Sequence, residues 1–254
     1  MPRLPQGFLN RPIAHRALHD KADGRPENSL AAVRAAVAAG YGIEIDLQIS
    51  SDGEAMVFHD YTLSRLTQAK GPLRARTAAE LGTIRLRDSD ETIPTLAQVL
   101  KTVAGKVPLL IEIKDQDGAL GPNVGRLEAA TARALERYEG PVALMSFNPH
   151  AVAEMQRLCP QRPRGLTTSA YRPEHWALVP AETRDRLRDI PDYERTGACF
   201  ISHEWRDLDR PRVQQLRDAG AAILCWTIRS PEAEQEARRI AQNITFEGYA
   251  AAQS

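Results

Sequence analysis

The chain has 254 residues, and its 33 basic and 33 acidic side chains give a formal net charge of zero, which argues against a general binder of nucleic acid or anionic membrane. Hydrophobic residues make up 43% of the chain and charged residues 26%, so we expect a packed core and little disorder. The chain has no apolar stretch of the roughly 18 residues that span a bilayer, and its start, MPRLPQGFLNRP, has no apolar signal core, so we expect a cytoplasmic protein without stable membrane insertion.

Short apolar segments alternate with helical segments along the chain. Strands are predicted at 11–16, 42–49, 55–59, 107–114, 141–147, 162–168, 197–202, 221–228 and 244–249. Helices are predicted at 28–40, 95–103, 123–138, 149–158, 211–220 and 231–241. Asn28 is the expected N-cap of the first helix, and Gly40 is its expected end. The stretches 60–94 and 171–196 have no regular strand pattern, so we expect short helices and loops there.

Repeated strand–helix units with apolar strands predict a parallel sheet covered by helices. About eight such strands fit a closed TIM (β/α)8 barrel, in one domain that spans 1–254, and a doubly wound open sheet is the alternative. The sequence contains neither GxGxxG nor GxxxxGK[ST], so nothing in it indicates a nucleotide-binding loop.

Acidic residues interrupt two of the predicted apolar strands. In GIEIDLQI, Glu44 and Asp46 are two positions apart and therefore share one face of the strand. In LLIEIK, Glu112 and Lys114 share a face in the same way. Carboxylates that point into a barrel repel each other and lose hydration, which costs several kcal/mol unless a positive charge lies between them.

Three converging oxygen donors suit a hard divalent cation such as Mg²⁺ or Ca²⁺, and no cysteine or paired-histidine spacing indicates zinc. The alternative interpretation is a buried network of ion pairs, in which Lys114 and Arg16 neutralise the acids.

Two histidines follow predicted strands. His15 ends the first strand and His59 ends MVFH, and the carboxyl ends of barrel strands are where barrel enzymes carry their chemistry. Because imidazole titrates near neutral pH, the pair suggests a general acid and a general base. Arg16 is able to donate two hydrogen bonds to an anionic substrate, and together with Lys114 and a metal ion it would make a positive pocket suited to phosphate.

These residues, in this order, resemble the glycerophosphodiester phosphodiesterase family over most of the chain. The matching segments are IAHR (13–16), ENSLAAVRAAVAAGYGIEIDLQISSDGEAMVFHD (27–60), LSRLT (63–67), IPTLAQVL (93–100), LLIEIK (109–114), SFNP (146–149) and CWTI (225–228). The resemblance implies a TIM barrel with a small insertion after an early strand. The polar stretch 60–94 looks like part of that insertion, capping the mouth of the barrel.

The resemblance also implies an activity, the metal-dependent hydrolysis of a small glycerophosphodiester to glycerol 3-phosphate and an alcohol. By position, Glu44, Asp46 and Glu112 look like the ligands of Mg²⁺ or Ca²⁺, and His15 and His59 look like the acid–base pair. In the mechanism proposed for the family, a glycerol hydroxyl attacks phosphorus, one histidine accepts its proton, the other protonates the leaving alcohol, and water opens the cyclic phosphate.

Further positions are candidates for substrate contact. By the resemblance, Arg16 and Lys114 look like phosphate contacts. Glu27 could join the polar shell around the metal, or simply stabilise the start of a helix. Phe147 and Trp226 end strands and could form an apolar wall for glycerol carbons, with ordinary core packing as the alternative.

The sequence also departs from the family pattern, and other functions remain open. The family usually has glycine where this chain has Ala17, and commonly has aspartate where this chain has Phe246, next to Thr245 and Glu247. Two rival interpretations are a phospholipase-D-like lyase that stops at a cyclic phosphate and a barrel that binds phosphorylated ligands without turnover.

Overall fold

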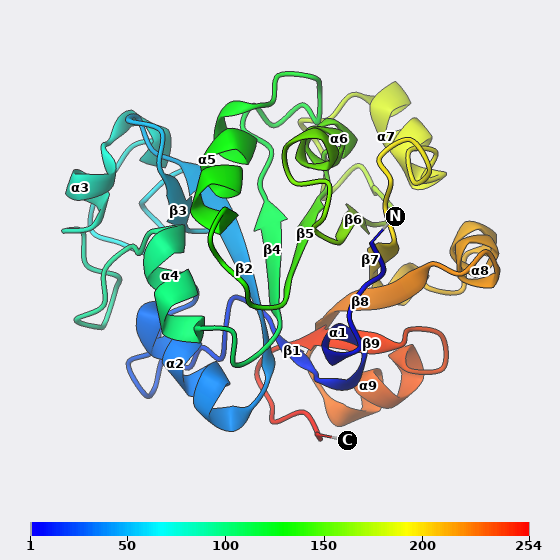
Figure 1. Cartoon of the computed structure of the whole chain (residues 1–254), viewed down its shortest axis with the longest axis horizontal. Helices are drawn as coiled ribbons and strands as arrows, with labels where there is room; N and C mark the ends of the chain where they lie inside the picture. The colour runs from blue at the N-terminus through cyan, green and yellow to red at the C-terminus, as the bar shows by residue number, and fades with distance from the viewer. Residues whose placement is uncertain (1, 254) are drawn as a thin grey trace.

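A closed ring of eight parallel strands forms the centre of the protein (Figure 1). The computed structural model describes residues 2–253. The order around the ring is β1–β2–β4–β5–β6–β7–β8–β9, and pairing of β9 with β1 closes it. The ring confirms the predicted TIM barrel and excludes the open sheet. The ring strands are β1 (Ile13–Ala14), β2 (Gly42–Ile49), β4 (Leu109–Ile113), β5 (Val142–Ser146), β6 (Arg164–Thr168), β7 (Phe200–Glu204), β8 (Ala222–Ile228) and β9 (Asn243–Phe246).

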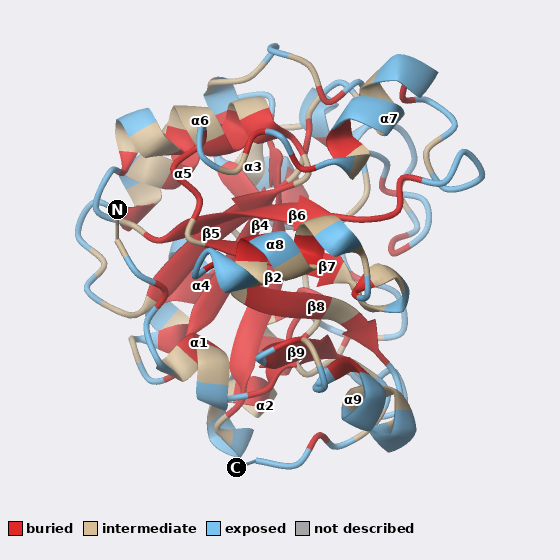
Figure 2. Cartoon of the chain, turned by 90° about the vertical axis from the view of Figure 1, so that its right-hand side faces the viewer, coloured by how far each residue is buried: buried red, intermediate tan, exposed pale blue. Residues whose placement is uncertain are grey.

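Helices cover the outside of the ring, and their solvent-facing sides are exposed while the strands are buried (Figure 2). The helices at or near the predicted positions are α2 (Leu30–Ala39), α4 (Leu96–Val103), α5 (Arg126–Leu135), α6 (Pro149–Leu158), α8 (Pro211–Asp218) and α9 (Pro231–Ala237). Shorter elements are α1 (Gly7–Asn10), α3 (Ala78–Leu81), α7 (Ala181–Arg188), and the 3₁₀ turns η1 (Leu73–Ala75) and η2 (Trp205–Asp207).

The alternation of β2 separates an apolar outer face from an acidic inner face. Ile43, Ile45 and Leu47 are fully buried in the layer between the strands and the helices. Because neighbours two apart share a face, Glu44 and Asp46 point into the barrel. Asp46 is in register with Glu112 on β4, so both acids lie at the same level.

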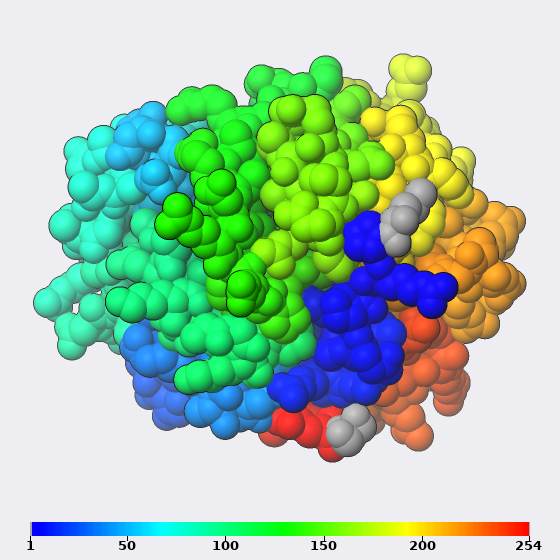
Figure 3. Space-filling model, in the orientation of Figure 1, coloured from blue at the N-terminus to red at the C-terminus, as the bar shows by residue number. Residues whose placement is uncertain are grey.

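The amino end of the barrel is filled by apolar side chains. Phe8 of α1, which the sequence did not predict, is fully buried there with Leu110 and Leu224. The side-chain amide of Asn243 on β9 donates to the carbonyls of Phe8 (2.7 Å) and Arg11 (2.6 Å). In Figure 3 the N-terminal residues lie between the green middle of the chain and its red C-terminal part. This packing leaves the carboxyl ends of the strands as the end that can carry a site.

The start of α2 differs from the prediction. Ser29, rather than Asn28, caps this helix, and its hydroxyl accepts from the backbone N–H of Ala32. Asn28 has φ of +60°, and its amide donates to Asp46 at 2.9 Å. The predicted cap is therefore wrong because the Asn28 side chain binds an inward-facing acid instead. The predicted end is confirmed, since Gly40 closes the helix with φ of +75°.

The stretch 60–94 packs on its own apolar cluster beside the barrel. It follows β3 (Ala55–Val57), a strand that runs antiparallel to β2 and lies outside the ring. Leu63, Leu73 and Leu81 are buried together with Phe58, away from the main core. The stretch 171–196, predicted as a long loop with a short helix, contains α7 and packs around Tyr171.

Candidate active site

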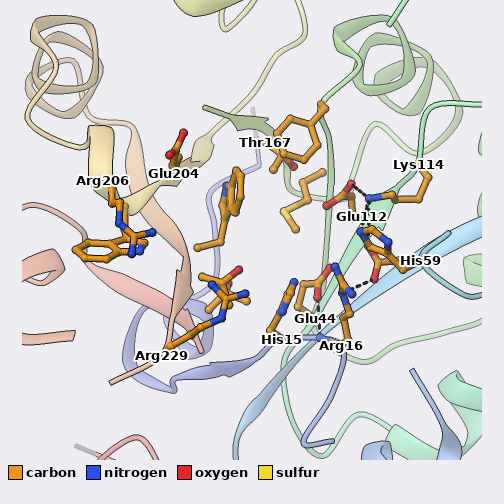
Figure 4. A pocket seen from close by; sticks show the side chains of 17 residues that line it. His15, Arg16, Glu44, His59, Glu112, Lys114, Thr167, Glu204, Arg206 and Arg229 are labelled. Carbon is orange, nitrogen blue, oxygen red and sulfur yellow. Dashed lines mark hydrogen bonds and ion pairs between the residues drawn. The ribbon is translucent and has the colours of Figure 1, made fainter. Parts of the chain in front are cut away.

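A cavity of about 250 Å³ opens at the carboxyl ends of the barrel strands. Figure 4 shows two sides, with His15, Arg16, Glu44, His59, Glu112 and Lys114 on one and Glu204, Arg206 and Arg229 on the other. We call these the charged wall and the far wall. The charged wall contains His15, Arg16, Glu44, Asp46, His59, Glu112 and Lys114. The far wall contains Phe147, Thr167, Glu204, Trp205, Arg206, Trp226, Thr227 and Arg229, and Met145 and Thr245 also line the cavity.

Three buried carboxylates meet on the charged wall. Ligand oxygens of Glu44, Asp46 and Glu112 all lie within 4.8 Å of one another, and each residue is at most 7% exposed. Burial, together with the charges of Asp46 and Glu112, raises the pKa of Glu44 well above its ordinary value. A cation held by all three oxygens would relieve this repulsion, and a hard divalent ion fits such a donor set.

Two cations partly neutralise the acids. Lys114 Nζ lies 2.8 Å from Glu112 and 3.5 Å from Asp46, and Arg16 Nε lies 3.6 Å from Asp46. Burial alone would raise the pKa of Asp46, but His59, Lys114 and Arg16 outweigh it and hold the pKa well below its usual range. Arg16 and Lys114 thus form the buried ion pairs that were the alternative to a metal site, but neither of them forms an ion pair with Glu44.

Glu44 accepts a hydrogen bond from the backbone N–H of Arg16 at 2.9 Å. Within residues 2–253, no ion pair reaches its carboxylate. The triad therefore keeps one acid whose charge the protein does not balance, which favours a place for a metal ion over a closed network of ion pairs.

Both predicted histidines line the cavity, but they reach it differently. His15 directly follows β1, as expected. His59 does not follow a ring strand, because β3 runs antiparallel to β2. The hairpin carries the chain back until the Phe58 N–H donates to the Asp46 carbonyl at 2.9 Å. The prediction that both histidines end parallel barrel strands is therefore wrong for His59, which follows an antiparallel strand. His59 nevertheless reaches the same cavity as His15.

A carboxylate binds the Nδ1 atom of each histidine. His15 Nδ1 lies 2.5 Å from Glu247, and His59 Nδ1 lies 2.7 Å from Asp60. His59 Nε2 lies 3.2 Å from Lys114 Nζ. Burial lowers the pKa of His15 below its ordinary value, although the hydrogen bond with Glu247 partly offsets this effect.

Of the three remaining residues predicted to contact substrate, Phe147 and Trp226 line the cavity and Glu27 does not. Glu27 lies behind Arg16, where its oxygens accept from Arg16 (2.8 Å) and from Arg65 (2.8 Å). Phe147 and Trp226 do line the cavity, with ring centroids 5.5 Å apart. Phe147 also packs against Trp176 at 4.9 Å, so the stretch 171–196 supports this wall.

Sequence reasoning did not select Asp60, Glu247, Thr167 or Thr245 for the site. Thr167 and Thr245 line the cavity, and their buried hydroxyls have no hydrogen-bond partner in the described part of the chain. For Thr245 and Glu247, the sequence signal was the alternation along ITFEG, which places both side chains on one face of the last strand. For Asp60 the signal was its position directly after His59.

The barrel and its charged pocket have the layout of TIM-barrel enzymes, whose sites lie at the carboxyl ends of the strands. Residues 15–244 match the model of the glycerophosphoryl diester phosphodiesterase family. The chain therefore belongs to this family. This match covers both walls of the cavity and ends one residue before Thr245.

Individual relatives agree with the family match. A glycerophosphodiester phosphodiesterase of Caldanaerobacter subterraneus subsp. tengcongensis is 30% identical over 177 residues, covering 66% of this chain and 70% of the relative. A putative glycerophosphodiester phosphodiesterase of Bacillus subtilis is 28% identical over 225 residues, covering 85% of each. An Oleispira antarctica phosphodiesterase, solved with its product sn-glycerol-3-phosphate, superposes with a TM-score of 0.76 at 26% identity, covering 94% of this chain and 93% of that one.

No helix within residues 2–253 combines the length and the apolar character required to cross a membrane.

Proposed function

We propose that the protein hydrolyses glycerophosphodiesters to glycerol 3-phosphate and an alcohol, with a divalent metal ion, Mg²⁺ or Ca²⁺, held by Glu44, Asp46 and Glu112. The observation that carries this proposal is the meeting of three buried carboxylates with two histidines and two cations in one cavity. The family membership and the product bound to the Oleispira relative support the same reaction.

The side chains of the charged wall divide the chemistry among them. Arg16 and Lys114 would bind the phosphate oxygens, since both are cations that face the cavity. The metal ion, when bound, would supply positive charge to the phosphate and bind glycerol hydroxyls. Thr167 and Thr245 would offer their unpartnered hydroxyls to the substrate.

His15 and His59 would move the protons. One imidazole accepts the proton of a glycerol hydroxyl as its oxygen bonds to phosphorus, and the other protonates the leaving alcohol as the bond from phosphorus to the alcohol oxygen breaks. Water then adds to the cyclic phosphate, opening it to glycerol 3-phosphate, with the two imidazoles in reversed roles. Arg16 and Lys114 hold the phosphate through both steps.

The proposal extends to the organisation of the chain. Residues 1–254 would act as a single phosphodiesterase domain in the cytoplasm, and residues 60–94 would form part of an insertion that caps the charged wall. Arg65, from this stretch, supports that placement because it binds both Glu27 and Asp60 beside the cavity.

The decisive experiment is a product assay. Glycerophosphocholine, glycerophosphoethanolamine and glycerophosphoglycerol are each incubated with the purified protein and Mg²⁺, Ca²⁺ or EDTA, and glycerol 3-phosphate and the cyclic phosphate are measured over time. We expect glycerol 3-phosphate with a metal ion present and none with EDTA. A cyclic phosphate that persists as the final product would instead identify a lyase. Binding without any product would identify a barrel that does not turn over its ligand.

A further inference from the structure

Glu247 lies outside the cavity but is held against it from three directions. Its backbone N–H donates to the carbonyl of Ile228 at the end of β8. Its Oε2 atom lies 2.5 Å from His15 Nδ1 and 3.5 Å from His19 Nε2. Its Oε1 atom accepts from Arg229, 2.8 Å from Nε and 2.7 Å from Nη2. The carboxylate therefore has both oxygens assigned to fixed partners.

This arrangement determines which nitrogen of His15 carries a proton. Burial would raise the pKa of Glu247, but the hydrogen bond from His15, the nearby His19 and the charge of Arg229 outweigh it, so the pKa lies well below its usual range. The group is thus a carboxylate at neutral pH and only accepts hydrogen bonds. The short contact therefore requires a proton on His15 Nδ1, which leaves Nε2 as the nitrogen available to the cavity.

His59 has the same surroundings on the opposite edge of the charged wall. Asp60 accepts from its Nδ1, and Arg65 binds Asp60 at 2.5 Å, just as Arg229 binds Glu247. The two carboxylates come from unrelated parts of the chain, Asp60 from the loop after β3 and Glu247 from the loop after β9. Their repetition indicates a shared requirement, namely an imidazole whose Nε2 faces the reacting atoms.

We propose that Glu247 is a positioning residue for His15: it holds the ring with Nδ1 protonated and turned out of the cavity, so that Nε2 exchanges protons with the substrate. This inference rests on the proposed hydrolysis and assigns one step of it to a residue that never touches the substrate.

The substitution Glu247→Gln tests the inference because it keeps the size of the side chain. Because the Arg229 guanidinium only donates hydrogen bonds, the glutamine oxygen faces Arg229. The amide NH₂ then donates to His15 Nδ1, and the proton must move to Nε2, which is the wrong tautomer. Positioning groups of this kind typically change rates by about 10- to 100-fold, and we expect kcat to fall by that factor while KM changes less than about twofold.

Two further variants separate positioning from structural support. Glu247→Asp keeps the charge and should recover part of the lost kcat. Glu234→Gln is the matched control, because Glu234 also binds an arginine, Arg238 at 2.7 Å, on nearby α9 but does not line the cavity. We expect the control to keep the kcat of the unaltered protein.

The tautomer itself is read from long-range ¹H–¹⁵N NMR spectra of protein with labelled histidines. We expect a proton on His15 Nδ1 in the unaltered protein and on Nε2 in Glu247→Gln. Unchanged kcat in Glu247→Gln, or a proton on Nε2 in the unaltered protein, would overturn the inference. If the unaltered protein hydrolyses none of the glycerophosphodiesters, the proposed function fails instead, and the NMR result alone decides the role of Glu247.

Discussion

The two walls of the cavity are built in different ways. On the charged wall, the three acids belong to ring strands and are buried, and His15, Arg16, His59 and Lys114 each follow a strand end within two residues. On the far wall, Trp205 and Arg206 belong to η2, and Phe147 leans on Trp176 from a long connecting stretch. The far wall also includes the strand residues Thr167, Glu204, Trp226 and Thr227, so its irregular part is limited to η2 and the stretch behind Phe147. Strand positions place atoms more accurately than loops do, so we expect the acids to carry the chemistry and η2 to contact the variable alcohol.

The charges of the two walls differ as well. The cations of the charged wall are paired with buried acids, whereas Arg206 is exposed and stacks over the Trp205 ring at 4.5 Å. Arg206 has no ion pair within residues 2–253. A group without a buried partner is weakly held, so its removal should matter far less than removal of an acid across the cavity.

The largest expected effect comes from the acid at the centre of the charged wall. Asp46→Asn removes one of the three charges that would hold the metal ion. Because a metal ion stabilises the transition state by several kcal/mol, kcat/KM should fall by about 10³-fold or more. Initial rates of glycerol 3-phosphate release at several Mg²⁺ concentrations measure this. If Asp46→Asn keeps full activity and the same dependence on Mg²⁺, the charged wall is no more important for activity than the far wall, and the comparison fails.

The next largest effect concerns the acid–base pair. His59→Ala should lower kcat by about 10²- to 10³-fold, because it removes one of the two groups that we propose to transfer protons. His175 is the matched control, since it is exposed in the loop that supports the far wall. His175→Ala should keep the activity of the unaltered protein. Equal losses in both variants would mean that unfolding, rather than proton transfer, is being measured, and circular dichroism checks this.

A third prediction concerns stability in acid. Burial would raise the pKa of Asp60, but hydrogen bonds from His59 and Arg65 outweigh it and hold the pKa well below its usual range. A depressed pKa in the folded state adds stability that is fully present above the unfolded-state pKa, near 4, and is lost progressively as the pH falls toward and through the folded-state pKa. Asp60→Asn should therefore lower the free energy of unfolding at pH 7, by about 1 kcal/mol given its partial exposure, and less at pH 3, where part of that stability has been lost.

Urea denaturation at both pH values measures the difference between the two proteins. Asp209→Asn, at an exposed position, serves as the control and should change the free energy of unfolding by less than about 0.5 kcal/mol at either pH. A deficit in Asp60→Asn that is the same at both pH values would show that the charge of Asp60 does not contribute.

The smallest effect is expected on the far wall. Arg206→Gln removes an exposed cation, so kcat/KM for glycerophosphocholine should change by less than about threefold. The same assay with glycerophosphoglycerol and glycerophosphoethanolamine shows whether the charge of Arg206 affects the preference for one alcohol group over another. A loss comparable to that of Asp46→Asn would place Arg206 among the groups that act on the phosphate.

Most of the charged wall was predictable because its pattern is local. A period of two along one strand places Glu44 and Asp46 on one face, and the same period places Glu112 and Lys114 together. The parallel ring then brings the two strands into register without further information. The family resemblance added the order and identity of the motifs.

The remaining features depend on packing between distant segments. The direction from which His59 enters follows from the hairpin of β2 and β3, which the strand pattern alone does not show. Ser29 caps α2 because Asn28 is engaged by Asp46, a contact across 18 positions. The pairing of His15 with Glu247 spans 232 positions, and no local pattern reports such a contact.

That last contact lies where the first and final ring strands join. β1 has only two residues and is held between β2 and β9. A chain cut before residue 247 lacks the partner of His15 even when all eight ring strands are in place. The orientation proposed above for His15 would thus depend on the closure of the ring between β1 and β9.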